Sequence, residues 1–304
     1  MKPVLLTGAT GFIGQYLQKA ILAGGTGVLA QVRPSSSNQN HLLSGVEKLP
    51  IDLSDDERLD AAVARASAVI YCAGSVRGRN MDDFRQANVS GVRSVVDSMN
   101  RTARNIPLLL ISSLAASRPQ VSDYANSKYL GEQQVVEYAE CPWTIFRPPA
   151  VYGPGDREML PIFKLARKGI ITPTGPRDQR VSLIHVDDLT AAALAWLESP
   201  EKCNRRIYTL DDGHSGGYSW EEIALAAGTG SYRRFNIPRW ALFAAGRANV
   251  LISRILGYAP MLTPGKAREL TQPDWVCNNR DLVEDIDWSP KIALDKGLNA
   301  LFEP

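Results

Sequence analysis

The chain has 304 residues, of which 44% are hydrophobic, and its 34 basic and 32 acidic side chains leave a formal net charge of +2. This length is enough to bury a full core and is long for one compact domain, so we expect a main domain with a smaller one. Because the basic residues are scattered and the net charge is small, composition argues against a nucleic-acid partner.

Four cysteines lie far apart in the chain and share no Cys-x-x-Cys spacing. They are Cys72, Cys141, Cys203 and Cys277. This arrangement argues against a zinc site and against a disulfide framework. We therefore expect no bound metal, and a reducing, cytoplasmic compartment is the default expectation for free thiols.

The N-terminal stretch combines a short apolar strand with a glycine-rich turn. Residues 4–6 are apolar, residues 8–14 read Gly-x-x-Gly-x-x-Gly, and a helical pattern runs from Gln15 to Ala23. Glycines permit a tight turn and a close backbone approach, and the helix N-terminus offers free N–H groups to a pyrophosphate. We interpret the stretch as a buried strand and a dinucleotide site rather than as a cleaved leader. The predicted cofactor contacts are Gly8, Thr10, Gly11, Phe12, Ile13 and Gly14.

Two further strands are expected to reach the adenosine end of the dinucleotide. The strand at 28–32 ends at Arg33. An acidic residue there would hydrogen-bond the ribose of NAD, whereas an arginine suits the 2′-phosphate of NADP. This favours NADP and leaves NAD open. A strand at 49–53 would place Asp52 and Leu53 at its exit, near the adenine of a doubly wound sheet.

A fourth parallel strand is predicted at 68–74, and its last residues are small enough to lie against the cofactor. These are Cys72, Ala73 and Gly74. A helix at 82–101 follows and carries Asn88. Because asparagine is neutral to unfavourable inside a helix, Asn88 is either a solvated polar residue or part of a proton-relay site.

The next apolar strand leads to a tyrosine and lysine pair. Residues 108–111 are all apolar and end in Ser112 and Ser113, hydroxyls at the strand end where open α/β sheets bind ligands. Tyr124 and Lys128 follow, four positions apart at the start of a helical pattern, so their side chains share one helix face. The lysine ammonium would favour the phenolate of Tyr124. Tyr124 would then donate a proton to a carbonyl or accept one from an alcohol.

In this order, the motifs resemble the extended short-chain dehydrogenase/reductase superfamily, also called the NAD-dependent epimerase/dehydratase family. The order is Thr-Gly-x-x-Gly-x-x-Gly, Asp-Leu, Asn, Ser-Ser and Tyr-x-x-x-Lys. Residues 147–156 are similar to the family's Arg-Pro-x-x-Val-Tyr-Gly-Pro-Gly loop beside the nicotinamide. Residues 182–189 are similar to its His-Val-x-Asp-Leu segment, so the resemblance covers residues 4–190.

The resemblance implies a role for each matched residue. Tyr124 would be the general acid/base, and Lys128 would lower its pKa while holding the nicotinamide ribose. Ser113 would hydrogen-bond the substrate oxygen, and Ser112 would be structural. Asn88 matches the position of the family's helix asparagine. The implied chemistry is hydride transfer between nicotinamide and a secondary alcohol or ketone, with the protein supplying orientation and the proton.

Further matched positions concern the cofactor loop and the substrate. Pro148 and Val151 are expected beside the nicotinamide. Tyr152 and Arg180 are candidate substrate contacts, because sugar-nucleotide members often carry an arginine for the substrate diphosphate; a solvated arginine is the alternative reading of Arg180. His185 invites a catalytic role, but its motif in the family favours packing against the cofactor domain.

Two features bear on the substrate. The segment between Ser113 and Tyr124 is shorter than in many sugar-nucleotide epimerases and dehydratases, which implies a more open site. Simple dehydration is disfavoured, because the family's dehydratases need an acidic pair near the serine and residues 114–116 supply none. The second feature is the predicted helix at 239–256, which is largely apolar but contains three arginines. Its length is too short and its charge too high for a membrane span. It could cover the pocket, pack as ordinary core, or lie on a membrane surface.

The C-terminal third is similar to that of members that act on hydrophobic ketones and alcohols. We therefore predict an NADP-dependent reductase of a hydrophobic, lipid-like substrate, for which a 3-oxo long-chain base or a ceramide-like lipid is one candidate. A nucleotide-sugar 4-epimerase or 4-ketoreductase stays open as an alternative. So does a non-catalytic cofactor-binding assembly protein.

The expected fold is α/β, with a Rossmann-type doubly wound parallel sheet and a smaller, mostly helical C-terminal region. Residues 1–150 would form the NAD(P)-binding domain, which would also receive a strand and a helix from about 178–200. Residues 151–177 and 201–304 would form the substrate-binding region. Peripheral membrane contact through residues 239–256 stays open, as does a homodimer through the helices that follow Asn88 and Tyr124.

Overall fold

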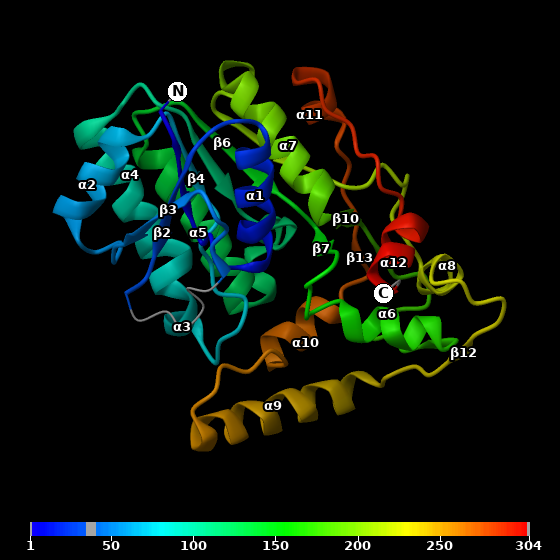
Figure 1. Cartoon of the computed structure of the whole chain (residues 1–304). Coiled ribbons are helices and arrows are strands. Elements are labelled where there is room, and N and C mark those ends of the chain that lie inside the picture. Colours follow the sequence, from blue (N-terminus) through cyan, green and yellow to red (C-terminus); the bar gives the residue numbers. More distant parts are fainter. Residues whose placement is uncertain (1, 35–40, 303–304) are drawn as a thin grey trace.

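The computed structural model describes residues 2–34 and 41–302. A large lobe holds a central sheet with helices on both faces, and a smaller lobe is built from the second half of the chain (Figure 1). The long helix α9 (Arg239–Leu256) runs along the lower side of the view, beneath α10 (Pro264–Leu270) and α6 (Leu160–Arg167).

Seven parallel strands form the central sheet in the order β11-β6-β5-β4-β1-β2-β3. The sequence order of the strands reverses between β1 and β4, and such a switch point is where doubly wound sheets bind ligands, at the carboxyl ends of the strands. The predicted fold class is thus confirmed. The strands are β1 (Val4–Thr7), β2 (Val28–Val32), β3 (Val46–Pro50), β4 (Ala68–Tyr71), β5 (Leu108–Ile111), β6 (Trp143–Arg147) and β11 (Arg206–Thr209).

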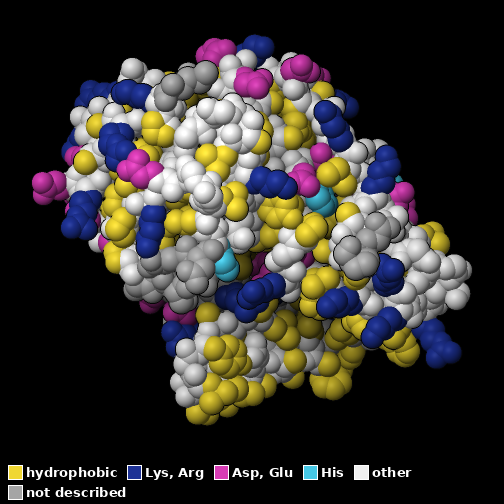
Figure 2. Space-filling view, in the orientation of Figure 1, with side chains coloured by type: hydrophobic (Ala, Val, Ile, Leu, Met, Phe, Trp, Pro, Cys, Tyr) yellow, Lys and Arg dark blue, Asp and Glu magenta, His cyan; other side chains and the backbone are white. Residues whose placement is uncertain are grey.

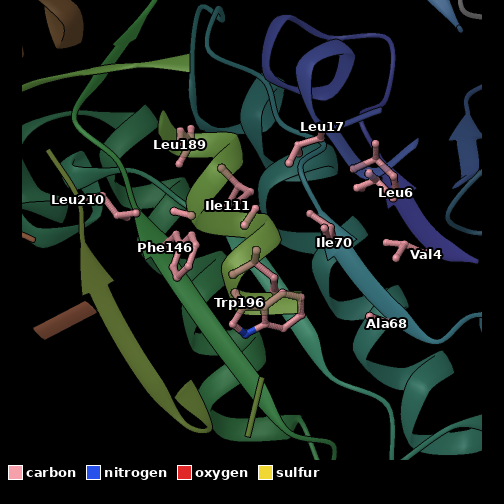
Figure 3. Close-up of a cluster of buried hydrophobic side chains, with 14 of the residues drawn as sticks. Val4, Leu6, Leu17, Ala68, Ile70, Ile111, Phe146, Leu189, Trp196 and Leu210 are labelled. Atoms are coloured by element: carbon pink, nitrogen blue, oxygen red, sulfur yellow. The ribbon is translucent and has the colours of Figure 1, made fainter. Parts of the chain in front are cut away.

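Both faces of this sheet are covered by helices, which is why its central strands are continuously apolar. Val4 and Leu6 point into one core, and Leu5 points into the other. Figure 3 shows the first core, in which Trp196 of α7 (Val186–Glu198) packs with apolar side chains of the sheet. The indole Nε1 of Trp196 donates to Thr144 Oγ1 at 2.8 Å. Helices α1 (Phe12–Ala23) and α7 (Val186–Glu198) cover that face. The other face is covered by α2 (Asp56–Arg65), α4 (Gly91–Thr102) and α5 (Asp123–Tyr138).

The predicted helix at 82–101 is divided into three parts. Helix α3 (Met81–Arg85) and helix α4 are joined by a π-helical turn at residues 86–90, which contains Asn88. Two glycines allow close packing here, since a Cβ on Gly131 would lie 2.1 Å from the Asn88 carbonyl oxygen and one on Gly91 would lie 2.4 Å from the Tyr71 hydroxyl. Single π turns inside α-helices often mark functional sites.

The strand expected within 178–200 does not enter the large sheet. Strand β10 (Leu183–His185) pairs instead with β7 (Ala150–Tyr152), outside the large sheet. Helix α7 then returns to the large sheet and packs on α1, so the next strand, β11, becomes the edge strand beside β6. Residues 206–209, which we assigned to the substrate-binding region, therefore belong to the large sheet.

Short strand pairs and helices build the smaller lobe. Its apolar core includes Tyr152, Phe163 and Leu298. The strand pairs are β7 with β10, β8 (Ile170–Ile171) with β12 (Arg233–Arg234), and β9 (Arg180–Val181) with β13 (Asp274–Trp275). The remaining helices are α8 (Trp220–Ala226), α11 (Arg280–Asp285) and α12 (Leu294–Phe302), and short 3-10 turns lie at 114–117, 119–121 and 200–203.

Helix α9 has the predicted bounds and contacts the rest of the protein through one face only. A Cβ on Gly246 would lie 2.8 Å from the backbone of Thr263, so glycine lets the helix approach the start of α10. Asn249 Nδ2 donates to the Leu262 carbonyl at 2.9 Å. Across residues 2–34 and 41–302, no helix is long and apolar enough to cross a membrane, and no group of three His, Cys, Asp or Glu side chains is arranged to hold a metal ion.

Candidate active site

The glycine turn after β1 packs so closely against neighbouring backbone that a side chain at Gly8 or Gly14 would clash. Gly8 has a φ of +66°, and a Cβ on it would lie 2.6 Å from the backbone nitrogen of Ala73 at the end of β4. A Cβ on Gly14 would lie 2.1 Å from the Gly8 carbonyl oxygen. The turn therefore lies directly against β4, at the switch point of the sheet.

The N-terminus of α1 is suited to an anion. Its N-cap residue is Gly11, which is exposed and provides no side-chain cap, and the first turn of the helix contains no acidic residue. Thr10, Phe12 and Ile13 flank this end and are half-buried. Free backbone N–H groups and the helix dipole both favour negative charge there. The residues present thus fit the pyrophosphate of a dinucleotide.

Arg33 and Asp52 lie close together just beyond β2 and β3. The pKa of Asp52 is held below its ordinary value, chiefly by hydrogen bonds from the backbone and side chain of Ser54, with the Arg33 charge as a smaller cause. The predicted strand at 49–53 ends earlier, at Pro50, so Asp52 and Leu53 lie in the following loop. Arg33 is exposed.

The end of β4 links the glycine turn to the predicted catalytic residues. Thr7 Oγ1 accepts hydrogen bonds from the backbone N–H groups of Cys72 and Ala73 at 3.2 and 3.1 Å. Burial raises the pKa of the Cys72 thiol to about 12, so this thiol is neutral at physiological pH. A Cβ on Gly74 would lie 3.1 Å from Asn88 Oδ1 and 3.9 Å from Lys128 Nζ.

Asn88 is a buried connector rather than a solvated residue. Its Nδ2 donates to Ser127 Oγ at 2.8 Å and to the Ser75 carbonyl at 3.0 Å, and its Oδ1 accepts from the Ser75 backbone N–H at 2.9 Å. The side chain therefore fastens the loop after β4 to helix α5, which carries Tyr124 and Lys128. Of the two sequence-based readings, burial excludes the solvated one.

Lys128 is buried at the end of β5. Its Nζ donates to the Ile111 carbonyl at 2.9 Å, and only 8% of the residue is exposed. Burial lowers the pKa of Lys128 to about 8, against the opposing influence of Cys72 and Glu132. The ammonium is therefore close to its titration point near neutral pH.

Tyr124 lies within hydrogen-bonding reach of Ser113. Burial raises the pKa of the Tyr124 hydroxyl, while a hydrogen bond with Ser113 and the charge of Lys266 act in the opposite direction. Ser113 caps the short turn at 114–117, where its Oγ accepts from the Ala115 backbone N–H at 3.2 Å. The Tyr124 ring packs edge-on against Phe84, with 5.9 Å between centroids.

The cation that acts on Tyr124 is Lys266 of α10, which the sequence reasoning missed. Lys266 Nζ contacts Glu269 Oε2 at 2.8 Å, and Glu269 accepts a further hydrogen bond from Ser122, the N-cap of the Tyr124 helix. Burial lowers the pKa of Lys266, but the charge and hydrogen bond of Glu269 outweigh burial and leave the pKa raised. Lys266 therefore stays charged beside Tyr124. No motif marks this lysine in the sequence.

Ser112, the neighbour of Ser113, points into a different network. Its Oγ donates to the fully buried Glu132, whose carboxylate also pairs with Arg147 through two hydrogen bonds. The Pro148 carbonyl, one residue further on, accepts from the Leu114 backbone N–H at 2.8 Å. These contacts fix the end of β5 to the end of β6 and leave Ser113 as the serine that faces Tyr124.

The loop after β7 lies against the start of α1. Tyr16 of α1 donates its hydroxyl hydrogen to the Pro154 carbonyl at 2.7 Å, and a Cβ on Gly155 would lie 3.9 Å from the Phe12 ring. Val151 of β7 packs against the apolar core beneath the sheet. The predicted cofactor loop and the glycine turn are thus neighbours.

Two predicted substrate contacts occupy other places in the fold. Tyr152 is fully buried, with its ring centroid 5.5 Å from that of Phe163, and a Cβ on Gly297 would lie 2.5 Å from its hydroxyl. A substrate contact by Tyr152 was therefore wrong, because the ring fills the core of the smaller lobe. Arg180 donates to the Gly217 carbonyl and pairs with Glu222 at 3.2 Å, and these contacts do not bring it to Tyr124.

His185 has a structural position. It is the N-cap of α7, where its Nδ1 accepts from the Asp187 backbone N–H at 3.3 Å. Burial lowers the pKa of His185, although the charges of Asp187 and Asp188 oppose this. The packing role favoured by the sequence motif agrees with this neutral, buried imidazole.

Comparison with known proteins bears on both the fold and the chemistry. Residues 4–210 match the model of the NAD dependent epimerase/dehydratase family. A ceramide reductase from Caulobacter vibrioides is 32% identical over 93% of this chain and 88% of its own. The mitochondrial NADH dehydrogenase [ubiquinone] 1 alpha subcomplex subunit 9 from Dictyostelium discoideum is 26% identical over 76% of this chain and 65% of its own.

A solved structure extends the likeness to the whole chain. The UDP-glucuronic acid 4-epimerase from Bacillus cereus, in complex with UDP-glucuronic acid and NAD, superposes with a TM-score of 0.72. The match covers 98% of this chain and 97% of the epimerase, at 17% identity. At this identity, the likeness concerns the fold.

Proposed function

The chain belongs to the NAD-dependent epimerase/dehydratase family, and we propose that it is an NADPH-dependent reductase of a hydrophobic, lipid-like ketone. A 3-oxo group on a ceramide-like lipid is the favoured substrate. The observation that supports the proposal is that Ser113 hydrogen-bonds Tyr124, while Lys128, one helical turn further along α5, lies near Gly74 at the switch point of the sheet. The ceramide reductase relative supports the lipid class.

Tyr124 is proposed as the proton donor. Because burial raises the pKa of its hydroxyl, Tyr124 carries its proton at neutral pH, as a general acid for ketone reduction must. Ser113 hydrogen-bonds the same hydroxyl and would orient the substrate oxygen beside it. A bound nicotinamide would supply the hydride. The ketone carbon accepts that hydride, and the ketone oxygen accepts the Tyr124 proton, which leaves a neutral secondary alcohol.

Lys128 and Asn88 are proposed to assist proton donation by Tyr124, Lys128 through its charge and Asn88 by positioning the helix. Lys128 lies one helical turn from Tyr124 and is proposed to favour, together with Lys266, the tyrosinate that forms when Tyr124 gives up its proton. Asn88 holds the loop at Gly74 in place against helix α5, through its hydrogen bonds to Ser75 and Ser127. Asn88 is therefore proposed as a positioning residue.

Lys266 is proposed to bind the polar end of the substrate. It places a positive charge beside Tyr124, and 29% of its side chain remains exposed although it pairs with Glu269, so a ligand can reach it. An amide or hydroxyl oxygen next to the ketone would accept a hydrogen bond from it. Such oxygen-rich head groups are characteristic of the proposed lipid class.

NADP is proposed over NAD because Arg33 is exposed at the end of β2, near Asp52. Because the Asp52 carboxylate lies near Arg33, it would partly offset the attraction of Arg33 for a 2′-phosphate, so the preference is expected to be moderate. Thermal-shift titration tests it: NADP should raise the melting temperature more than NAD at equal concentration, since a tighter ligand stabilises more by mass action. Equal shifts, or a larger shift with NAD, would refute the assignment of Arg33.

We also propose a homodimer in which α4 and α5 form the contact. The α5 side chains of Val136 and Tyr138 are 40% and 43% exposed, and Arg93 of α4 stacks over the Tyr138 ring. An apolar and aromatic surface of this kind is suited to a self-complementary contact. Sedimentation analysis of the wild type and of Tyr138→Glu tests it.

Two other functions compete with the reductase. An assembly role is favoured by the mitochondrial NADH dehydrogenase relative, and a nucleotide-sugar activity is favoured by the shared fold of the epimerase. The pairing of Arg180 with Glu222 weighs against a free diphosphate-binding arginine. The Ser113, Tyr124 and Lys128 set weighs against a purely non-catalytic role.

One experiment separates these functions. NADPH oxidation is followed with 3-oxo-sphinganine, with an N-acylated 3-oxo lipid and with a UDP-4-keto sugar, using the wild type and Tyr124→Phe. We expect turnover of the lipid ketones and a loss of about 10²–10⁴-fold in Tyr124→Phe, the range for a general acid. Turnover of the sugar alone would reverse the substrate assignment. Cofactor binding with no turnover of any ketone would favour the assembly role.

A further inference from the structure

Helix α9 exposes apolar side chains along the face that points away from the protein. Five of them form what we call the α9 apolar face: Trp240 is 76% exposed, Leu251 60%, Ile252 47%, Ile255 78% and Leu256 68%. Figure 2 shows this surface as yellow side chains along the lower edge of the molecule. Soluble monomers rarely expose such a continuous apolar surface without a binding partner.

The surface is distinguished by charge as well as by apolarity. Residues 223–268 contain no Asp or Glu and seven Arg or Lys, although the whole chain is nearly neutral. Five of these side chains are exposed. Arg268 donates to the Val121 carbonyl, and no carboxylate of residues 2–34 and 41–302 lies within ion-pair distance of the other four. We call them the outer arginines: Arg233, Arg239, Arg247 and Arg254.

The helical repeat separates three kinds of side chain around α9. At about 100° per residue, the buried Leu242, Gly246 and Ser253 fall within one narrow sector, against α10. Trp240, Leu251 and Ile255 of the α9 apolar face fall on the opposite side. Arg247 and Arg254 fall between these two sectors on one flank, and Ile252 and Leu256 fall between them on the other. A helix lying in a membrane interface has this arrangement, with apolar residues in the acyl region and cations at the head groups.

A hollow beside the segment just before α9 also combines positive charge with apolar side chains. It is lined by Lys168, Tyr232, Arg233 and Phe235, which combine two cations with two aromatic rings. Aromatic side chains are enriched at the level of lipid head groups, where one end of the ring is apolar and the other is hydrated. The hollow lies beside the strand pair β8 and β12, a few residues before α9 begins.

We propose that α9 docks this protein on an anionic lipid bilayer, with the α9 apolar face in the acyl boundary and the outer arginines at the phosphates. A second copy of the chain is a poorer occupant, because a two-fold contact would bring the same arginines together with no carboxylate between them. An anionic bilayer supplies the missing negative charge, and each Lys or Arg near such a surface strengthens binding.

The orientation also bears on substrate uptake, a link that rests on the proposed function. The opposite face of α9 packs on α10, and α10 carries Lys266 beside Tyr124. Only one short helix therefore separates the docked face from the catalytic tyrosine. A lipid ketone would therefore have to move only past this helix to pass from the bilayer to Tyr124.

Vesicle sedimentation with the full-length protein tests the docking. Vesicles of phosphatidylcholine with phosphatidylglycerol should bind the wild type, more weakly as salt is raised, and vesicles of phosphatidylcholine alone should bind it less. The double variant Leu251→Ser with Ile255→Ser should lose about tenfold or more in binding to both vesicles. The double variant Arg247→Gln with Arg254→Gln should lose about tenfold on the anionic vesicles only.

A matched control carries the same chemical change on other surfaces. Leu225 of α8 and Val283 of α11 are 59% and 40% exposed, so Leu225→Ser with Val283→Ser removes two exposed apolar side chains away from α9. We expect wild-type vesicle binding for this control. Wild-type binding by the Leu251 and Ile255 double variant, or no vesicle binding by the wild type, would refute the proposal.

Two further measurements keep the result interpretable. A dimer in light scattering that disappears in the Leu251 and Ile255 double variant would assign the face to a second copy and refute lipid docking. Turnover of a short, water-soluble ketone should be equal in the wild type and in all three double variants. Because docking is measured without cofactor or substrate, its failure would leave the Tyr124 assignment intact, and loss of turnover in Tyr124→Phe would leave docking intact.

Discussion

The central sheet buries its apolar side chains, whereas helix α9 exposes many of its own. In the sheet, strands such as β1 and β5 are apolar on both faces, and helices cover each face completely. Helix α9 is also rich in apolar residues, but α10 covers only one side and leaves Trp240 and Ile255 about three-quarters exposed. Apolar side chains therefore form internal core in one region and outer surface in the other.

The comparison also separates the two parts of the proposed function. The residues proposed for proton transfer lie at strand ends and on α5, elements that are fixed on two faces by packing. The residues proposed for substrate and surface recognition, Lys266 and the outer arginines, lie on α9, α10 and β12, outside the large sheet. Changes in the first region should therefore abolish chemistry, and changes in the second should alter binding.

The largest effect is expected from Lys128→Met, which should abolish turnover and yet stabilise the fold. Burial lowers the pKa of Lys128 from 10.5 to about 8, so the charged form carries a cost at neutral pH. At about 1.4 kcal/mol per pH unit, that cost is about 3 kcal/mol, reduced by the lost hydrogen bond to Ile111. Urea unfolding at pH 7 should show the gain. A destabilised variant would contradict the burial argument.

The same pKa predicts how pH acts on the wild type. Between about pH 8 and 10.5 the native state has released the Lys128 proton and the unfolded state still holds it, so the contribution of this group to stability rises with pH. Below pH 8 the cost of burying the charge is fully present. The ketone kcat/KM should fall as pH rises through about 8, because the ammonium that favours the tyrosinate is lost. A flat kcat/KM profile across this range would exclude the role of Lys128.

A smaller effect is expected to distinguish two adjacent serines. Ser113→Ala should lower kcat by about 10²-fold with little change in stability, because Ser113 faces Tyr124. Ser112→Ala should leave kcat within a few fold and destabilise the fold by about 1–3 kcal/mol, because it leaves the buried Glu132 one donor short. Equal losses of kcat in the two variants would show that the serines are not divided in this way.

The smallest of these effects is expected at Lys266. Lys266→Met should raise the KM for the lipid ketone about tenfold, the value of one hydrogen bond to a charged group, with a lesser change in kcat. Lys266→Arg should restore KM because it keeps the charge, and the exposed Lys296 provides a control in Lys296→Met. A drop in kcat with an unchanged KM would move Lys266 from substrate binding to proton transfer.

Much of the large lobe could be predicted because its signals are local. The glycine spacing after β1, the apolar strands and the four-residue spacing of Tyr124 and Lys128 each depend on neighbours in the chain, so the fold class and the family followed from them. The division of the predicted helix at 82–101 did not follow, because the π turn at Asn88 depends on Gly131 and Ser75 packing against it.

The smaller lobe was less predictable for the same physical reason. Tyr152 carries a family motif, yet its burial depends on Phe163 and Gly297, which are distant in the sequence. The strand at 183–185 has an ordinary apolar pattern, and only the position of β7 decides that it pairs outside the large sheet.

The sequence by itself determined the α/β fold, the glycine turn after β1 and the placement of Tyr124 and Lys128 one turn apart on one helix, because periodicity and short spacings encode them. Only the tertiary structure decided that Lys266 lies beside Tyr124, that Ser112 turns to Glu132, and that one side of α9 is left uncovered. Each of these depends on contacts between segments far apart in the chain, which residue spacing does not record.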